Sequence, residues 1–138
     1  KKLMQIAGTT PRHGTPPSGL AKVLKHLGIR HEVIPSGSIE LLEKKIRAQN
    51  LCIVNYQAWG RSGGEFASLD TGHYSVAFGY SPTHLYIADP AKHKTPKLAT
   101  PGFRTIRKDL FVKRWRDKAT TRKPEIHTYH WMMAVPLT

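Results

Sequence analysis

The stretch HYSVAFGYSPTHLYIADP, residues 73–90, decides the fold of this chain. Its first part, residues 73–80, places side chains alternately on two faces, which is the period of a β-strand. Turn-forming residues follow at 81–83 (Ser-Pro-Thr), and residues 85–89 continue as a second strand. The stretch therefore predicts a β-hairpin, whose two strands run antiparallel.

Two amphipathic helices are expected before the hairpin. The first follows the proline-rich start at 15–18, because proline is tolerated in the first turn of a helix, and Gly28 supplies its end. The second begins near Ser38 and ends around residues 49–50. Both repeat apolar residues at the spacing of one helical face: Leu20, Val23, Leu24 and Leu27, then Ile39, Leu42 and Ile46.

Four further elements are expected from the apolar pattern. The continuous apolar run at 51–54 predicts a strand buried on both faces, and a short extended segment at 29–34 comes before it. Residues 106–115 predict a helix in which two aromatic residues lie one turn apart. The alternation over 129–135 predicts a closing strand.

Two segments rich in glycine, serine or proline are expected to be loops, at 61–64 and 90–102. Trp59 and Phe66 flank the first of them, shortly before His73. They either line a substrate groove or anchor the loop, and the sequence does not separate these two interpretations.

A chain of 138 residues with 39% hydrophobic residues has enough material for one core, so residues 1–138 are interpreted as a single domain. The expected fold class is α+β, with N-terminal helices packed on an antiparallel β-sheet. The apolar runs are far shorter than the roughly 20 residues of a transmembrane helix, and no signal peptide is recognisable. We expect no membrane span.

The sequence has one cysteine, Cys52, which excludes an intramolecular disulfide and favours a reducing, cytoplasmic location. Cys52 lies within the apolar run at 51–54. A thiol in apolar surroundings has a raised pKa, which suppresses the reactive thiolate. We therefore expect a core residue at this position and no catalytic nucleophile.

The formal net charge of +13 is the most unusual bulk property of the chain. Such a charge attracts nucleic acids, anionic surfaces or acidic peptides. Basic residues cluster at 104–108 and 113–116, interleaved with Phe111 and Trp115. This pattern is found on nucleic-acid-binding surfaces, but it is more often the solvated face of a helix whose aromatic residues are core.

The hairpin brings one histidine close to one aspartate. With the turn centred near residue 81, His73 lies eight positions before the centre and Asp89 eight after it, which predicts that they are direct cross-strand neighbours. Such neighbours point to the same face, so an imidazole N–H would meet a carboxylate. This is the base and its orienting group in a catalytic triad, without the nucleophile. A bulge or a one-residue slip would turn one side chain to the other face.

Eight histidines raise the question of a metal site. None of them shows a His-x3-His spacing with a carboxylate partner, and the chain has no pair of cysteines. His127 and His130, three residues apart, lie in or before a predicted strand. We expect neither a metal nor another cofactor.

The order of motifs along the chain resembles the C39-like cysteine peptidases, a papain-like family that includes bacterial leader-processing domains. The resemblance covers nearly the whole sequence. Within the resemblance, the Gly-His-aromatic and Asp-Pro motifs are the most specific. The matching segments are Gly14-Thr15, Gly28-Ile29, Cys52 to Tyr56, Thr71 to Val76, Ile87 to Pro90, and Phe111 with Trp115.

The resemblance implies a hydrolase of papain-like fold that cleaves peptide bonds with a Cys/His/Asp triad and needs no metal. In that family a cysteine at the head of the first helix attacks the carbonyl carbon. By resemblance, His73 is the base and Asp89 its orienting group. The cysteine-bearing helix has no counterpart in these 138 residues, so the chain contains no nucleophile.

Three functions remain open at this point. The chain begins with Lys1 instead of methionine, which favours a cysteine on an upstream segment and thus an active thiol peptidase. Alternatively, the domain is a pseudo-peptidase that binds peptides without cutting them. The third function, a basic nucleic-acid-binding domain, depends on charge alone. The expected partner is a peptide or protein substrate, and the positive charge favours an acidic one.

Overall fold

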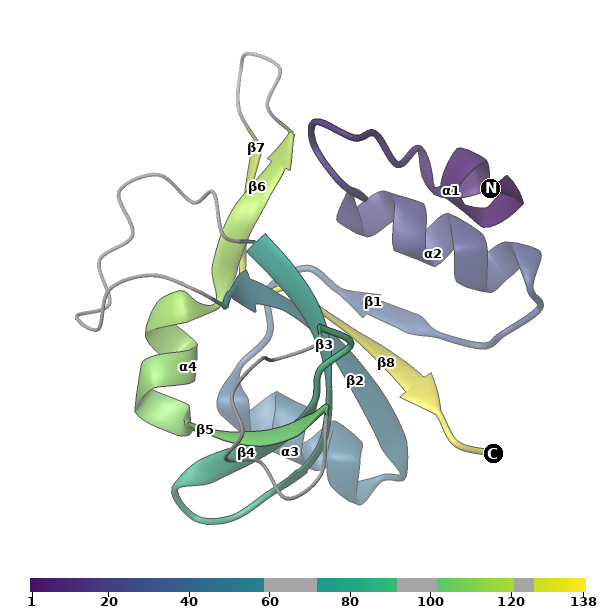
Figure 1. Ribbon diagram of the computed structural model, residues 1–138. Coiled ribbons are helices and arrows are strands. Elements are labelled where there is room, and N and C mark those ends of the chain that lie inside the picture. The colour runs from purple at the N-terminus through teal and green to yellow at the C-terminus, as the bar shows by residue number, and fades with distance from the viewer. Residues whose placement is uncertain (59–71, 92–101, 121–125) are drawn as a thin grey trace.

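The computed structural model describes residues 1–58, 72–91, 102–120 and 126–138. Two helices begin these parts of the chain, and runs of strands separated by single helices follow (Figure 1). Their bounds are α1 Lys2–Ala7, α2 Pro17–His26, β1 Glu32–Ile34, α3 Ile39–Arg47, β2 Asn50–Gln57, β3 Gly72–Tyr80, β4 His84–Ala88, β5 Phe103–Arg107, α4 Lys108–Arg114, β6 Arg116–Thr120, β7 Ile126–Tyr129 and β8 Met132–Pro136.

An antiparallel sheet organises the molecule. Its strand order is β1-β8-β2-β3-β4-β5, and β6 and β7 form a separate two-stranded ribbon. The predicted α+β class is therefore confirmed. None of the helices in the described part of the chain is long and apolar enough to cross a membrane.

The core lies between α3, α4 and one face of the sheet. The Ser38 side chain caps α3 by accepting a hydrogen bond from the backbone N–H of Leu41 at 3.1 Å, which starts the helix where the sequence predicts it. The buried core residues come from these helices and from alternate positions of the central strands: Leu42, Cys52, Val54, Tyr56, Ala58, Ala77, Leu85, Ile87, Phe111, Trp115, Met132 and Ala134.

Trp115 joins α4 to the C-terminal strands. Its indole ring stacks on His130 with ring centroids 4.8 Å apart, and its Nε1–H donates to the carbonyl oxygen of Trp131 at 2.9 Å. His130 has a positive φ of 57°, an uncommon conformation for a residue other than glycine. The predicted strand over 129–135 is therefore interrupted here, and β7 and β8 belong to different sheets.

The helices α1 and α2 pack side by side at one side of the molecule, near β1 (Figure 1). They approach so closely that a Cβ atom at Gly19 would collide with the carbonyl group of Ala7. The hydroxyl of Tyr74 on β3 donates to the carbonyl oxygen of Thr15 at 2.8 Å. This bond ties the connection between the two helices to the sheet.

Two predicted elements need correction. The strand at 51–54 is not buried equally on both faces: Cys52 and Val54 are inaccessible, but Leu51 and Ile53 on the opposite face are only partly covered. The predicted helix at 106–115 begins at Lys108, because Ile106 pairs with Leu85 as part of β5. The helix α1 and the strands β5, β6 and β7 were not predicted; α1 has no side-chain N-cap, although Gly8 ends it in the left-handed conformation.

The hairpin of β3 and β4 is confirmed, and it contains a β-bulge. Next to the turn, Tyr80 pairs with Leu85 and Gly79 with Tyr86, but beyond the irregularity Ala77 pairs with Ile87. Phe78 is the extra residue, and inserting one residue changes which side chains share a face. If the pairing next to the turn continued without the bulge, Asp89 would lie opposite Val76, whose side chain points to the face away from His73. With the bulge, Asp89 points to the same face as His73.

We expect Trp115→Ala to lower the free energy of unfolding by about 3 to 5 kcal/mol, because it empties a buried aromatic site and removes the contact with His130. Chemical denaturation followed by circular dichroism measures this change. Val112→Ala is the matched control on the same helix, since Val112 is 37% exposed, and it should change stability by no more than about 0.5 kcal/mol. Equal losses for the two variants would contradict this account of the core.

Candidate active site

His73 and Asp89 are in direct contact at the end of the hairpin distant from its turn. Nε2 of His73 lies 2.6 Å from Oδ1 of Asp89. The Asp89 side chain is fully buried, while 14% of the His73 side chain is exposed. Since an ionised carboxylate can only accept hydrogen bonds, Nε2 carries the proton in this contact. This contact orients the imidazole and makes Nδ1 the ring nitrogen that would exchange a proton with a reacting group.

The cross-strand arithmetic predicted the wrong register for this pair. Val76 pairs with Ala88, so continuing that register places Asp89 level with Ser75 and not with His73. The contact is a diagonal one, two residues along β3 on the same face. The prediction that His73 and Asp89 are directly opposite each other is therefore wrong, whereas the two side chains are observed to lie close together. Their catalytic roles stay predictions.

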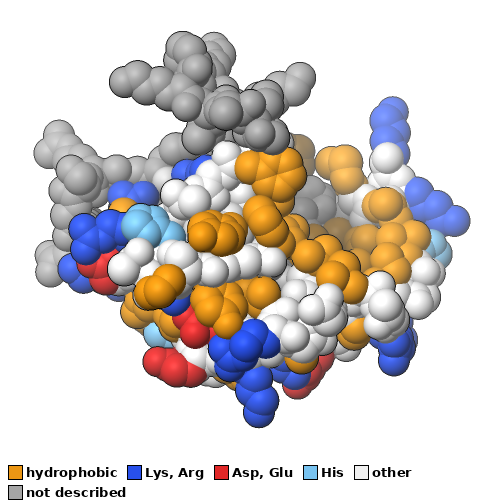
Figure 2. All heavy atoms as spheres, turned by 90° about the horizontal axis from the view of Figure 1, so that it is seen from below, with side chains coloured by type: hydrophobic (Ala, Val, Ile, Leu, Met, Phe, Trp, Pro, Cys, Tyr) orange, Lys and Arg blue, Asp and Glu red, His pale blue; other side chains and the backbone are white. Residues whose placement is uncertain are grey.

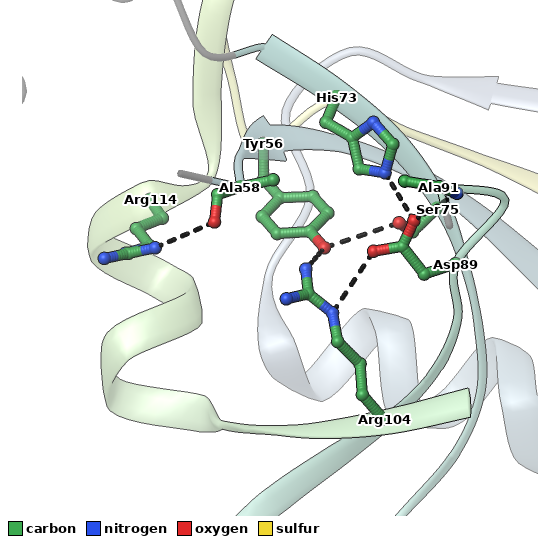
Figure 3. Close-up of polar contacts among 8 residues, drawn as sticks. All are labelled: Tyr56, Ala58, His73, Ser75, Asp89, Ala91, Arg104 and Arg114. Atoms are coloured by element: carbon green, nitrogen blue, oxygen red, sulfur yellow. Dashed lines mark hydrogen bonds and ion pairs between the residues drawn. The ribbon is translucent and has the colours of Figure 1, made fainter. Parts of the chain in front are cut away.

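Asp89 has further partners, which Figure 3 shows together with the histidine. The backbone N–H of Ala91 donates to Oδ1 at 2.9 Å. Nε of Arg104 lies 3.3 Å from Oδ2, as an ion pair whose alignment is not that of a hydrogen bond. Both oxygens of the buried carboxylate thus face positive or donor groups.

Tyr56 lies beside this group on β2. Its hydroxyl accepts a hydrogen bond from Nη2 of Arg104 and lies 3.4 Å from Oγ of Ser75. Its ring is edge-on to the His73 imidazole, with centroids 6.2 Å apart. Arg104 and Tyr56 were not recognised as site residues from the sequence. Arg104 stood within a basic cluster, and its contact with Asp89 requires the pairing of β4 with β5.

Cys52 is a core residue, as predicted. It is inaccessible to solvent, and burial raises the pKa of its thiol to about 12. It pairs with Ala77, four residues along β3 from His73, which corresponds to about 13 Å along a strand. Cys52 therefore cannot serve as the nucleophile for this histidine.

An apolar groove of about 510 Å³ lies on the face of the sheet opposite α3 and α4. Leu20 of α2 lines one side of it, and the sheet supplies Ile53, Tyr74, Val76, Ala88 and Phe103. Ser75 and Asp89 also border the groove, but the side chains of the His73–Asp89 dyad lie on the other face of the sheet, the face of Tyr56, and His73 does not line the groove. From below, hydrophobic side chains form a band across the molecule and border a recess (Figure 2). Phe103 and Phe78 remain 47% and 39% exposed.

The basic residues of 104–116 are largely engaged within the protein. Besides Arg104, Arg107 pairs with Asp109 at 2.7 Å and Lys108 pairs with Glu43. Nη1 of Arg114, which is buried, donates to the carbonyl oxygen of Ala58 at 3.1 Å. These contacts favour structural roles for the cluster, and nucleic-acid binding stays a prediction.

Asp117 of β6 lies beside Gly72, the first residue of β3. Its carboxylate fills the space that a Cβ atom at Gly72 would need. Burial raises the pKa of Asp117 above its ordinary value of 3.8. Hydrogen bonds from the Lys118 backbone N–H at 2.8 Å and from Nε2 of Gln57 at 3.1 Å act in the opposite direction. Within the described ranges, no group of three or more metal-ligating side chains is found. Trp59 and Phe66 lie outside the described residues.

No family model and no curated protein matches the sequence. Solved structures do match the fold. One is described as a C39-like peptidase from Bacillus anthracis, with a TM-score of 0.59 and 17% identity over 91% of this chain and 61% of that chain. The fold is that of the C39-like peptidases.

A second match within this fold is the peptidase domain of Streptococcus ComA, a bifunctional ABC transporter involved in quorum sensing. The TM-score is 0.60 at 18% identity, over 98% of this chain and 76% of that chain. At such identities the likeness establishes the C39-like fold alone. This chain spans about three fifths of the length of the Bacillus structure.

We expect Cys52 to resist alkylation by iodoacetamide in the folded protein at mildly alkaline pH. With the pKa at about 12 instead of 9.0, the thiolate population is about a thousandfold smaller, before burial also hinders access. Mass spectrometry of the native and the urea-unfolded chain measures the labelling. Rapid labelling of the native chain would show that Cys52 is accessible and overturn its assignment to the core.

We expect Asp117→Asn to increase stability at neutral pH. A carboxyl whose folded pKa is raised stabilises the fold in its protonated form, and that contribution is lost as the pH rises above the ordinary value of 3.8. The difference between variant and wild type should therefore vanish in acid and grow towards neutrality. Denaturation curves across this pH range test it, with exposed Asp109→Asn as the comparison.

Proposed function

We propose that this chain is the histidine- and aspartate-bearing part of a C39-like cysteine peptidase. The observation that carries the proposal is the contact of His73 Nε2 with Asp89 Oδ1 at 2.6 Å, with the carboxylate fully buried behind the imidazole. A buried acceptor fixes the tautomer and the orientation of the ring, which is what a general base requires. The C39-like fold supports the same chemistry.

The proposed reaction needs a thiol from outside these residues. His73 would take the thiol proton on Nδ1, and the thiolate would attack the peptide carbonyl carbon. As the tetrahedral intermediate collapses, the C–N bond breaks and His73 returns the proton to the departing amine. Water then hydrolyses the thioester, with His73 again acting as base. Asp89 stabilises the imidazolium in each step and does not itself take the proton.

The apolar groove supports the idea that a further segment packs on this domain. Its lining of Leu20, Ile53 and Val76 leaves apolar surface uncovered on the face of the sheet opposite the dyad. An amphipathic helix placed there would bury this surface. The longer chains of the structural neighbours agree with such an addition, because this chain covers 61% and 76% of their lengths.

We expect thiol-dependent hydrolysis from the gene product that includes any cysteine-bearing segment preceding Lys1. His73→Ala should lower kcat by about a hundredfold or more, because general base catalysis is lost. Hydrolysis of a fluorogenic peptide library and labelling by a thiol-directed electrophile measure the two effects. His84→Ala, on β4 of the same hairpin, is the matched control and should keep wild-type activity.

Failure of the extended protein both to hydrolyse and to become labelled would leave the pseudo-peptidase as the better candidate. That second function is favoured because the single cysteine of the sequence, Cys52, is buried. It requires peptide binding without cleavage, which fluorescence anisotropy with labelled peptides detects. The net charge of +13 leads us to propose acidic peptides as ligands or substrates in either case.

A further inference from the structure

Arg104 of β5 contacts Asp89 on the side opposite to the contact with His73, and it also contacts Tyr56 (Figure 3). Its Nε lies 3.3 Å from Oδ2 of Asp89, while its Nη2 donates to the Tyr56 hydroxyl. The Arg104 side chain is 22% exposed and the Asp89 side chain is fully buried. The guanidinium therefore separates this carboxylate from solvent.

A fully buried carboxylate remains ionised only where hydrogen-bond donors or positive charges stabilise it. His73 provides a positive charge only when it is protonated, and during proposed catalysis it alternates between two protonation states. Arginine keeps its charge at all relevant pH values. Among the residues that the structure describes, Arg104 thus brings to Asp89 a charge that does not change while the imidazole accepts and releases its proton.

Tyr56 fixes the position of the guanidinium. It is inaccessible to solvent, its hydroxyl accepts from Arg104, and the guanidinium carbon lies 5.8 Å from the centre of its ring. Since Tyr56 also packs on Phe111 of α4 with centroids 5.5 Å apart, the hydrophobic core holds this tyrosine in place. The charge on Arg104 is thus positioned by the core and not by a flexible surface contact.

We propose that Arg104 is a positioning residue of the active site, which keeps Asp89 ionised and oriented so that His73 holds its proton on Nε2. The catalytic meaning of this assignment depends on the proposed peptidase function. The effect on the histidine tautomer does not depend on it. The positioning network then crosses four neighbouring strands, with Tyr56 on β2, His73 on β3, Asp89 directly after the end of β4 and Arg104 on β5.

The test is the tautomer of His73, measured on this chain by ¹⁵N–¹H NMR of the imidazole ring. In the wild type we expect the Nε2–H form. Arg104→Met, which keeps the bulk and removes the charge, should give a mixture of both tautomers and loss of the protected Nε2 proton signal. Arg104→Lys should restore the Nε2–H form in part, since it returns the charge without the guanidinium fork.

Arg107→Met is the matched control on the same strand, because Arg107 forms an exposed ion pair with Asp109 and lies away from the dyad. It should keep the wild-type tautomer. A folded Arg104→Met chain with an unchanged Nε2–H signal would overturn the proposal. If Arg104→Met does not fold, Arg104→Gln takes its place, and an unchanged signal in that variant has the same meaning.

Activity gives a second readout in the gene product that carries a nucleophile. We expect Arg104→Met to lower kcat by about tenfold or more with KM nearly unchanged, because it acts through Asp89 and not through substrate contacts. A change confined to KM would contradict the positioning role. If the wild type hydrolyses nothing, the peptidase proposal fails, while the tautomer measurement still decides the role of Arg104.

Discussion

The arrangement of the site depends on one buried charge, the carboxylate of Asp89. Removing a carboxylate from water costs several kcal/mol unless donors and cations surround it. Here the backbone of Ala91, the imidazole of His73 and the guanidinium of Arg104 do so, and each comes from a different part of the chain. Strands β3, β4 and β5 must therefore be paired before the charge can be accommodated. Folding and the assembly of the site are the same event.

The two faces of the sheet have different roles. Helices α3 and α4 bury one face, and Phe111 of α4 packs against Tyr56. The other face carries the groove, whose apolar residues remain partly accessible between α2 and the sheet. The side chains of the dyad lie on the helix-covered face, near its margin, because His73 is the second residue of β3 and pairs with Tyr56. The dyad therefore combines a rigid support, which orients the carboxylate, with an imidazole that is 14% exposed.

The sequence predicts elements better than it predicts contacts between them. The hairpin, α2, α3 and the central strand follow from local period and from caps such as Ser38, so these were predicted near their observed positions. The proximity of His73 and Asp89 was also predicted, but through a register that ignored the bulge. A bulge and the contact with Arg104 are properties of paired strands. No spacing within a single segment encodes them, and the resemblance to the C39-like family did not indicate them either.

The bulge at Phe78 has a consequence for how this hairpin can vary among homologous proteins. Because side chains alternate along a strand, the turn and the bulge together decide whether residues 73 and 89 share a face. A residue inserted into or deleted from either strand between the turn and the dyad would separate the two side chains unless the bulge were gained or lost with it. Natural changes of strand length here should therefore come in steps of two, or together with the bulge. The hairpin thus imposes a parity rule on insertions and deletions.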